Sequence, residues 1–106
     1  MLFELRTYTC KPGMRDQWVK WAEEKVIPFQ VSKGVVVVGS FVSNDDPDVY
    51  IWIRRFADEA DKERTYKAVY EDPVWKNEIG PRNGELLFRE KIVVTNMSAT
   101  PHSVIS

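Results

Sequence analysis

Near the start of the chain, side chains alternate between apolar and polar with the period of two residues that is typical of β-strands. Residues 2–9 begin with this alternation, whereas residues 49–56 form a predicted strand with bulky apolar residues on both faces. The segment 35–43 is rich in β-branched residues and apolar on both sides, as expected of a strand that is covered on both faces. A fourth strand is predicted at residues 89–97.

Between the first two strands, the apolar residues take the spacing of a helix. Trp18 and Trp21 belong to an apolar stripe that begins at Met14, which predicts an amphipathic helix. Pro28 is expected to kink or loosen its last turns, because proline lacks a backbone donor. Gly34 is the predicted stop of this helix.

A second helix is expected after the third strand. Asp58 is a good N-cap for it, and the helix should run to about Glu71. Asp72-Pro73 resembles a second N-cap and first helical position, which predicts a short helix ending at Gly80-Pro81. The segment 81–87 is predicted to be a loop with at most one helical turn.

The resulting order of elements, β-α-β-β-α-β, predicts an α+β fold of the ferredoxin-like type. In this arrangement two helices lie on one face of an antiparallel four-stranded sheet. We expect one domain over residues 1–97 and a polar tail at 98–106 that is loose unless a partner holds it. At least two strands are apolar on both sides, so the helix-free face needs a cover. A second copy of the same sheet can supply it, since a two-fold axis pairs one surface with itself.

Composition and charge narrow the possible partners. The 106 residues include 15 basic and 16 acidic ones, a balance that argues against binding to nucleic acid. The first residues resemble no secretory signal, and the longest fully apolar run, residues 35–38, is far too short to span a membrane. Cys10 is the only cysteine, so no intrachain disulfide is possible. We therefore expect a cytoplasmic protein with no membrane partner.

The sequence lacks the residues that several kinds of chemistry require. Pairs of Cys or His at metal-ligand spacing are missing, and the aspartates at 45, 46 and 48 fit a solvated turn better than a calcium loop. The only histidine, His102, lies in the tail, far from any nucleophile expected to be ordered. No phosphate-binding glycine loop is present. The sequence predicts neither a metal site nor a cofactor.

The best candidates for a ligand site are polar and aromatic residues on two strands that should be neighbours. They are Arg6, Tyr8, Trp52 and Arg54. An arginine held among aromatic rings could fix an anion or an enolate oxygen, and Tyr8 could donate a proton. The alternative interpretation is that Glu4 pairs with Arg6 or Arg54 inside the dimer interface and binds nothing. Because the register between the strands is unknown, the sequence does not say which of these side chains share a face.

The segment Glu4-Leu5-Arg6-Thr7-Tyr8-Thr9 with the turn Lys11-Pro12-Gly13 resembles the opening of NIPSNAP-family domains. Further similarities are Pro28 late in the first helix, Gly39-Ser40-Phe41, the end of the strand 52–56 and the step Asp72-Pro73-Val74-Trp75. The resemblance covers roughly residues 2–97.

This resemblance implies a dimeric α/β barrel, in which two sheets face each other and helices coat the outside. It carries over no catalytic residue, because biochemical function in the family is poorly defined. The chain also differs from haem-handling relatives on the same barrel fold, which depend on a histidine near the ligand. Here the only histidine is His102.

Three functions remain open at this point. The first is a homodimeric domain that binds a small apolar or aromatic acid, either in the barrel or between helices and sheet. The second is a cofactor-free isomerase, cyclase or monooxygenase that acts on a planar aromatic substrate. The third is a structural or protein-interaction module. Whether the chain is an enzyme is not decided by the sequence.

Overall fold

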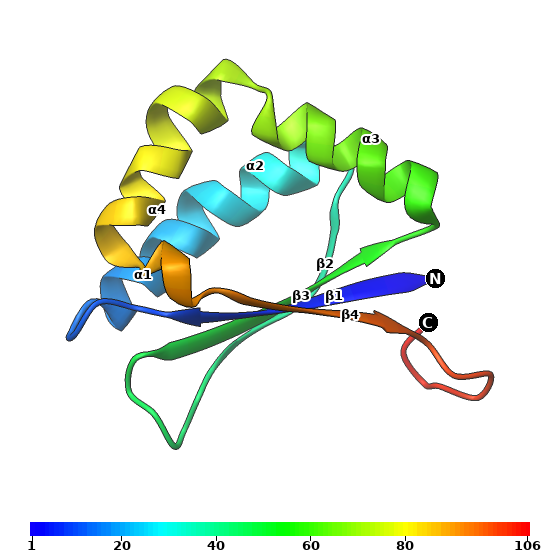
Figure 1. Cartoon of the computed structure of the whole chain (residues 1–106), viewed down its shortest axis with the longest axis horizontal. Coiled ribbons are helices and arrows are strands. Elements are labelled where there is room, and N and C mark those ends of the chain that lie inside the picture. Colours follow the sequence, from blue (N-terminus) through cyan, green and yellow to red (C-terminus); the bar gives the residue numbers. More distant parts are fainter.

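The four strands pair into one antiparallel sheet in the order β2-β3-β1-β4, which is the ferredoxin-like order predicted from the sequence. This computed structural model describes all residues, 1–106. All helices lie on one face of the sheet, so the α+β class with one helical layer is confirmed (Figure 1). The strands are β1 (Leu2–Thr9), β2 (Val36–Val42), β3 (Val49–Phe56) and β4 (Val93–Ser98).

The first helical segment is broken into three parts. It comprises α1 (Arg15–Trp21), the π-helical turn η1 (Ala22–Val26) and α2 (Ile27–Ser32). The loosening expected around Pro28 is present as this π-turn, which ends two residues before the proline. Gly34 follows the helix with a φ of 94°, a conformation that glycine adopts without steric cost.

The helix α3 (Glu59–Tyr70) begins as its sequence predicts. The side chain of Asp58 accepts a hydrogen bond from the backbone N–H of Asp61 at 2.7 Å. The carboxylate of Asp61 in turn accepts from the backbone N–H of Ala57 at 2.9 Å. Two otherwise unpaired backbone donors are satisfied in this way, as in a capping box.

The predicted helix end at Gly80-Pro81 and the predicted loop at 81–87 are wrong. The chain forms the π-helical turn η2 (Trp75–Ile79) and continues without interruption into α4 (Gly80–Leu86). Pro81 stands at the start of α4, where a missing backbone N–H is tolerated. The following segment also differs, because residues expected to begin a strand form the 3₁₀ turn η3 (Arg89–Lys91) instead.

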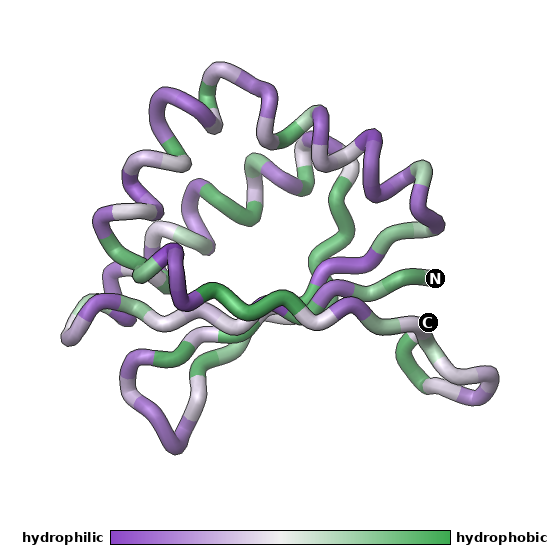
Figure 2. Tube along the Cα trace, in the orientation of Figure 1, coloured by the Kyte–Doolittle hydropathy of each residue, from purple (hydrophilic) through white to green (hydrophobic).

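The sheet has two different faces. The helix-covered face of β3 is buried at Tyr50, Trp52 and Phe56, and these side chains pack with residues of the helices in the core. The opposite face is also apolar, and Phe41 and Val93 are more than half exposed there. Figure 2 shows the apolar stretches of the strands beside the polar β2–β3 loop and the largely polar α3. None of the helices is long and apolar enough to cross a membrane.

Candidate functional site

Strand register brings the predicted candidates together on one face of the sheet. In the pairing of β1 with β3, Glu4 lies opposite Arg54, Arg6 opposite Trp52 and Tyr8 opposite Tyr50. Side chains two residues apart on a strand point to the same face. All of these side chains therefore lie on the helix-covered face of the sheet.

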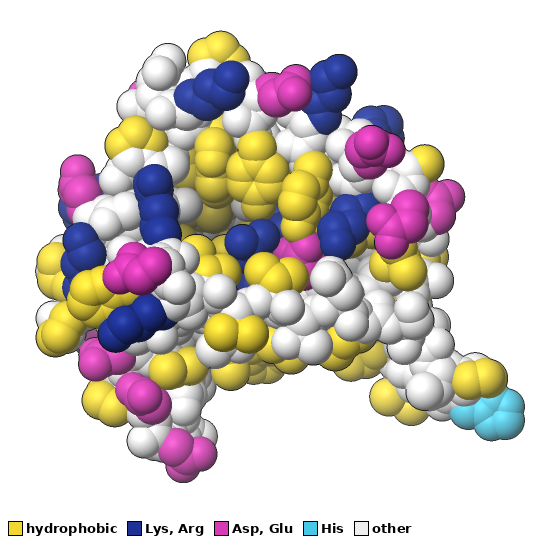
Figure 3. Space-filling model, in the orientation of Figure 1, with side chains coloured by type: hydrophobic (Ala, Val, Ile, Leu, Met, Phe, Trp, Pro, Cys, Tyr) yellow, Lys and Arg dark blue, Asp and Glu magenta, His cyan; other side chains and the backbone are white.

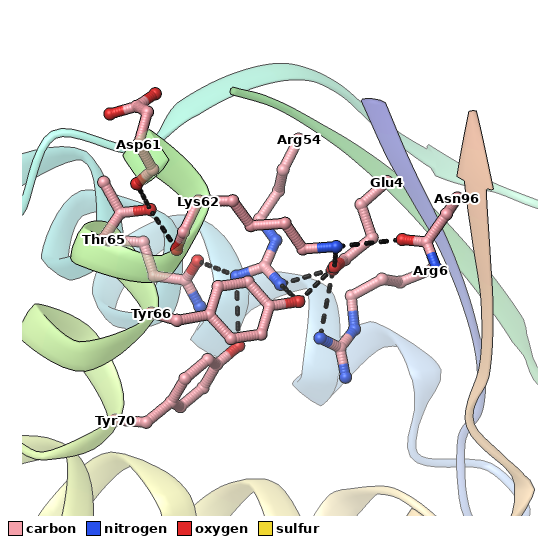
Figure 4. A network of polar contacts seen from close by, with 10 residues as sticks. Glu4, Arg6, Arg54, Asp61, Lys62, Thr65, Tyr66, Tyr70 and Asn96 are labelled. Carbon is pink, nitrogen blue, oxygen red and sulfur yellow. Dashed lines mark hydrogen bonds and ion pairs between the residues drawn. The ribbon is translucent and has the colours of Figure 1, made fainter. Parts of the chain in front are cut away.

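Arg54 is the centre of a buried polar network (Figure 4). Its Nη1 donates to Oε1 of Gln30 at 2.7 Å and to the hydroxyl of Tyr70 at 3.0 Å. Its Nη2 donates to Oε1 of Glu4, and to the hydroxyl of Tyr66 at 3.0 Å. The side chain is only 1% exposed. A guanidinium this deeply buried needs such a set of acceptors to offset its lost hydration.

Glu4 is the only carboxylate paired with this group of cations. Burial alone would raise the pKa of Glu4, but the charge of Arg54 and hydrogen bonds from Arg54 and Tyr66 outweigh it and lower the pKa to about 2. Burial and the hydrogen bond to Glu4 raise the pKa of Tyr66 above its usual value. Glu4 is therefore charged and Tyr66 neutral near pH 7.

Two further cations contact the same carboxylate. Nη1 of Arg6 lies 3.2 Å from Oε1 of Glu4, and Nζ of Lys62 lies 3.4 Å from its Oε2. Lys62 also donates to Oδ1 of Asn96 on β4 at 3.0 Å. Unlike Arg54, Arg6 keeps 16% of its side chain exposed. Arg6 is therefore the predicted arginine that a molecule from solution could reach.

Tyr8 and Trp52 have a different environment. Both are buried in the main core cluster, where Tyr8 packs edge-on against Trp18 at 5.6 Å between ring centroids. Trp52 lies below Arg54, whose guanidinium carbon is 5.0 Å from its ring centroid. Both side chains pack beneath the arginines. Neither the hydroxyl of Tyr8 nor the indole of Trp52 lines the open side of the network.

A hollow between the helical layer and the sheet lies next to this network. Figure 3 shows it walled by hydrophobic side chains, with charged side chains at its base. Part of it is an open pocket of about 560 Å³. Tyr70 connects the pocket with the network. Its side chain lines the pocket, and its hydroxyl accepts a hydrogen bond from Arg54. The other lining residues are Trp75, Lys76, Gly80, Pro81 and Arg89.

Aromatic rings form a continuous row along this wall. Tyr66 and Tyr70 meet edge to face at 5.2 Å, Tyr70 meets Trp75 at 4.9 Å, and Trp75 stacks on Phe29 at 6.2 Å. Such contacts fix the rings and leave an apolar surface beside the cationic base. The site thus combines a charged end with an aromatic wall.

Sequence reasoning missed four members of the network: Gln30, Lys62, Tyr66 and Tyr70. Two of them are tyrosines of the second helix, and a buried tyrosine hydroxyl usually needs a partner. Their spacing of four residues places both on one face of α3, which was the available signal. Nothing in the sequence marks Gln30 as fully buried.

The alternative interpretation of the arginines is correct in part. Glu4 does pair with both Arg6 and Arg54. However, the pairs lie beneath the helices, and not on the helix-free face where a second sheet would pack. A role of these residues in setting the register of a dimer stays a prediction. No cluster of three or more His, Cys, Asp or Glu side chains could hold a metal ion.

Fold and site together define a ferredoxin-like α+β domain with a buried arginine–glutamate network beneath its helices. The NIPSNAP family model matches residues 3–103, and the chain belongs to this family. No curated protein matches its sequence closely enough to add a function.

Solved structures agree with this assignment. A NIPSNAP family protein of unknown function from Agrobacterium tumefaciens is 25% identical, with a TM-score of 0.89 over 100% of this chain and 94% of that one. A second NIPSNAP family protein from the same organism is 24% identical, with a TM-score of 0.85 over 96% and 88% of the two chains. An antibiotic biosynthesis monooxygenase shares the fold at 18% identity, with a TM-score of 0.68 over 95% and 100%.

Proposed function

We propose that this NIPSNAP domain binds a small apolar or aromatic acid in the hollow between its helices and its sheet, and that Arg6 anchors the acid group. The single observation that carries this proposal is an imbalance of charge. Arg6, Arg54 and Lys62 all contact one carboxylate, that of Glu4. Two positive charges therefore lack a paired anion in a largely buried site.

The surrounding groups do not correct this imbalance. Tyr66 is neutral because its pKa is raised. Glu59 and Glu63 line a groove beside Lys62, yet both are exposed and neither forms an ion pair with it. Burying cations without paired anions is unfavourable. An anionic ligand would remove this cost, and its charge is therefore the main determinant of binding.

Hydrogen-bond donors in the network also outnumber their acceptors. Nε of Arg6, Nε of Arg54 and Nε2 of Gln30 are buried and have no acceptor within the chain. Unmatched buried donors are rare in folded proteins, and their presence often indicates a functional site. At Arg6 the guanidinium also remains partly exposed, so a carboxylate can approach it.

The aromatic wall indicates what the rest of the ligand should be. A flat apolar body would lie along Tyr70 and Trp75, while its acid group points to Arg6. Small-molecule sites commonly have this composition, a mostly apolar wall with a few polar anchors. We therefore favour aromatic monoacids over purely aliphatic ones.

An enzyme that uses no cofactor is the second candidate, and the fold shared with the antibiotic biosynthesis monooxygenase supports it. Such an enzyme needs a group that exchanges protons near neutral pH. Glu4, with its pKa lowered to about 2, and Tyr66, with its pKa raised, are both poorly suited to that role. For this reason we favour binding over catalysis.

We further propose that the domain works as a homodimer whose sheets face each other, as a dimeric α/β barrel. The support is the helix-free face, where Val36, Phe41 and Val93 are 42%, 53% and 56% exposed. Large apolar patches on a surface usually mark an interaction site. The ligand site lies on the other face of the sheet and does not compete with this contact.

A thermal-shift screen with benzoate, phenylacetate and short-chain aliphatic acids tests the binding proposal. An aromatic acid should raise the unfolding midpoint of the wild-type protein through linkage, and Arg6→Gln should abolish the rise. Arg82→Gln, at an exposed arginine on α4, is the matched control and should respond like the wild type. The proposal fails if no acid raises the midpoint, or if Arg6→Gln responds as strongly as the control.

A further inference from the structure

The tail after β4 folds back under the sheet, on the face opposite the helices (Figure 1). Three hydrogen bonds hold this course. The backbone N–H of Ser103 donates to the carbonyl of Thr100 at 3.1 Å, and the hydroxyl of Ser103 donates to the carbonyl of Ile105 at 2.7 Å. Nη1 of Arg55 donates to the carbonyl of Ser106 at 2.7 Å. Arg55 belongs to the helix-free face of β3. The tail therefore provides an acceptor for the charge of Arg55 on this otherwise apolar face.

The tail does not pack tightly against its own sheet. A half-open cavity of about 250 Å³ separates the two, and its walls are mainly apolar. Well-packed protein interiors leave few voids larger than a water molecule. The packing of this end of the sheet is thus incomplete in the single chain. The lining residues on the sheet are Phe3, Val38, Ile53 and Met97, and Ile105 contributes from the tail.

The outer side of the tail is apolar as well. Val104 is 100% exposed and the neighbouring Ile105 is 52% exposed, and Figure 2 shows this apolar stretch close to the end of the chain. A short segment that is apolar toward the sheet and away from it resembles a strand covered on both sides. It needs a second surface beyond the one it already faces.

The shape of the face indicates which surface this is. The β2–β3 hairpin and the tail project from the same face of the sheet, at its two opposite ends (Figure 1). Two copies packed face to face avoid a clash if the hairpin of each lies beside the tail of the other. A two-fold axis provides this arrangement, because it pairs a surface with itself. The two projections of this face are therefore compatible with packing against a second copy.

We propose that residues 99–106 are part of the interface with a second copy of this chain. The tail lies between the two sheets, and Val104 packs against the partner copy. This inference rests on the proposed homodimer, and it adds that the tail strengthens the dimer. A tail that merely shielded its own sheet would have the opposite effect, since it would have to leave before a partner could bind.

Sedimentation equilibrium of the full chain tests the inference with three variants. Val104→Asp should raise the dimer dissociation constant by about tenfold or more, because it places a charge in an apolar contact. Val74→Asp makes the same change at an exposed valine of the helical layer and should leave the constant within about twofold of the wild type. Phe41→Asp reports on the sheet face itself and should weaken the dimer. Circular dichroism checks that all variants are folded.

The outcomes separate the two proposals. If Phe41→Asp weakens the dimer but Val104→Asp behaves like Val74→Asp, the face-to-face dimer stands and the role of the tail is overturned. If Val104→Asp tightens the dimer, the tail is a competitor of the partner and the inference is likewise overturned. A wild-type chain that stays monomeric at millimolar concentration overturns both, and leaves the apolar cavity to a small molecule.

Discussion

Arg6 and Arg54 lie on neighbouring strands but differ in their partners and in their exposure to solvent. Arg54 has four side-chain partners and almost no exposed surface. Arg6 shares only the carboxylate of Glu4 and remains partly open to solvent. The first arginine is therefore a structural centre of the core, whereas the second is available to a ligand.

Substitution should separate these roles. Arg54→Gln should lower the free energy of unfolding by about 3–5 kcal/mol, because it removes the main buried partner of Glu4. Arg6→Gln should cost only about 1 kcal/mol, since it breaks a partly exposed pair. Urea unfolding at pH 7 measures both values. Equal losses in the two variants would contradict the division of roles.

Lowering the pH should decrease the free energy of unfolding, because Glu4 becomes protonated. Its pKa falls from an ordinary value of 4.5 to about 2 in the folded chain, so the charged form stabilises the protein above pH 4.5. This contribution, about 3 kcal/mol from the size of the shift, is lost as the pH falls from 4.5 toward 2. Urea unfolding as a function of pH should show the loss.

The matched variants for this test are Glu4→Gln and Glu63→Gln. Glu4→Gln should be less stable at neutral pH and should lack this part of the acid dependence. Glu63→Gln changes an exposed glutamate of α3 and should keep the wild-type dependence. An unchanged acid profile in Glu4→Gln would show that other carboxylates cause the loss.

At this scale the sequence predicted that Arg6 and Arg54 lie on neighbouring strands, but not what surrounds them. The period of two within each strand puts Glu4 on the side of Arg6 and Tyr8, and Trp52 on the side of Arg54, but the register that joins the two sets was not predictable. Which of them reach solvent depends on the side chains of α2 and α3 above, and those contacts are set by tertiary packing. Gln30, 24 residues from Arg54 in the chain, could not have been paired with it from the sequence.

Among the secondary-structure elements, the strands and α3 were predictable because their signals are local. The bounds predicted for β3, residues 49–56, are confirmed, and Asp58 marked the start of α3. The α4 helix was missed because glycine followed by proline usually ends a helix. The π-turn η2 before it places Pro81 at a helix start, where the residue is compatible with the helix.

Removing the cap of α3 tests the local origin of this helix. Asp58→Ala should lower the free energy of unfolding by about 1 kcal/mol, because the backbone N–H of Asp61 loses its acceptor. Asp58→Ser should retain most of the stability, since serine caps helices about as well. The measurement is urea unfolding of the three proteins side by side. Equal stability of the alanine and serine variants would show that the cap contributes little.

Across the whole molecule, the sheet separates two surfaces of different composition. The helix-covered face holds the charged network and the hollow, and the opposite face is apolar and carries the tail. The two-sided apolar strands predicted this second surface from the sequence alone. How the tail lies on it was not predictable, because the last nine residues show no periodic pattern.

A dimer that forms through this face should make stability depend on concentration. Raising the protein concentration a hundredfold should raise the unfolding midpoint by about 5 °C, because only the folded chains associate. Phe41→Asp should remove this dependence. Differential scanning calorimetry measures both. A midpoint that is independent of concentration in the wild type would count against the dimer.

The central claim is that Arg6 receives the acid group of a ligand while Arg54 does not. Nitrogen-15 NMR of the arginine Nε–H groups tests it most directly, with Arg6→Lys and Arg54→Lys used to assign the two signals. During titration with benzoate or phenylacetate, the Arg6 signal should shift until it saturates, and the Arg54 signal should stay in place. An Arg6 signal that does not move while an acid binds elsewhere on the protein would contradict the account.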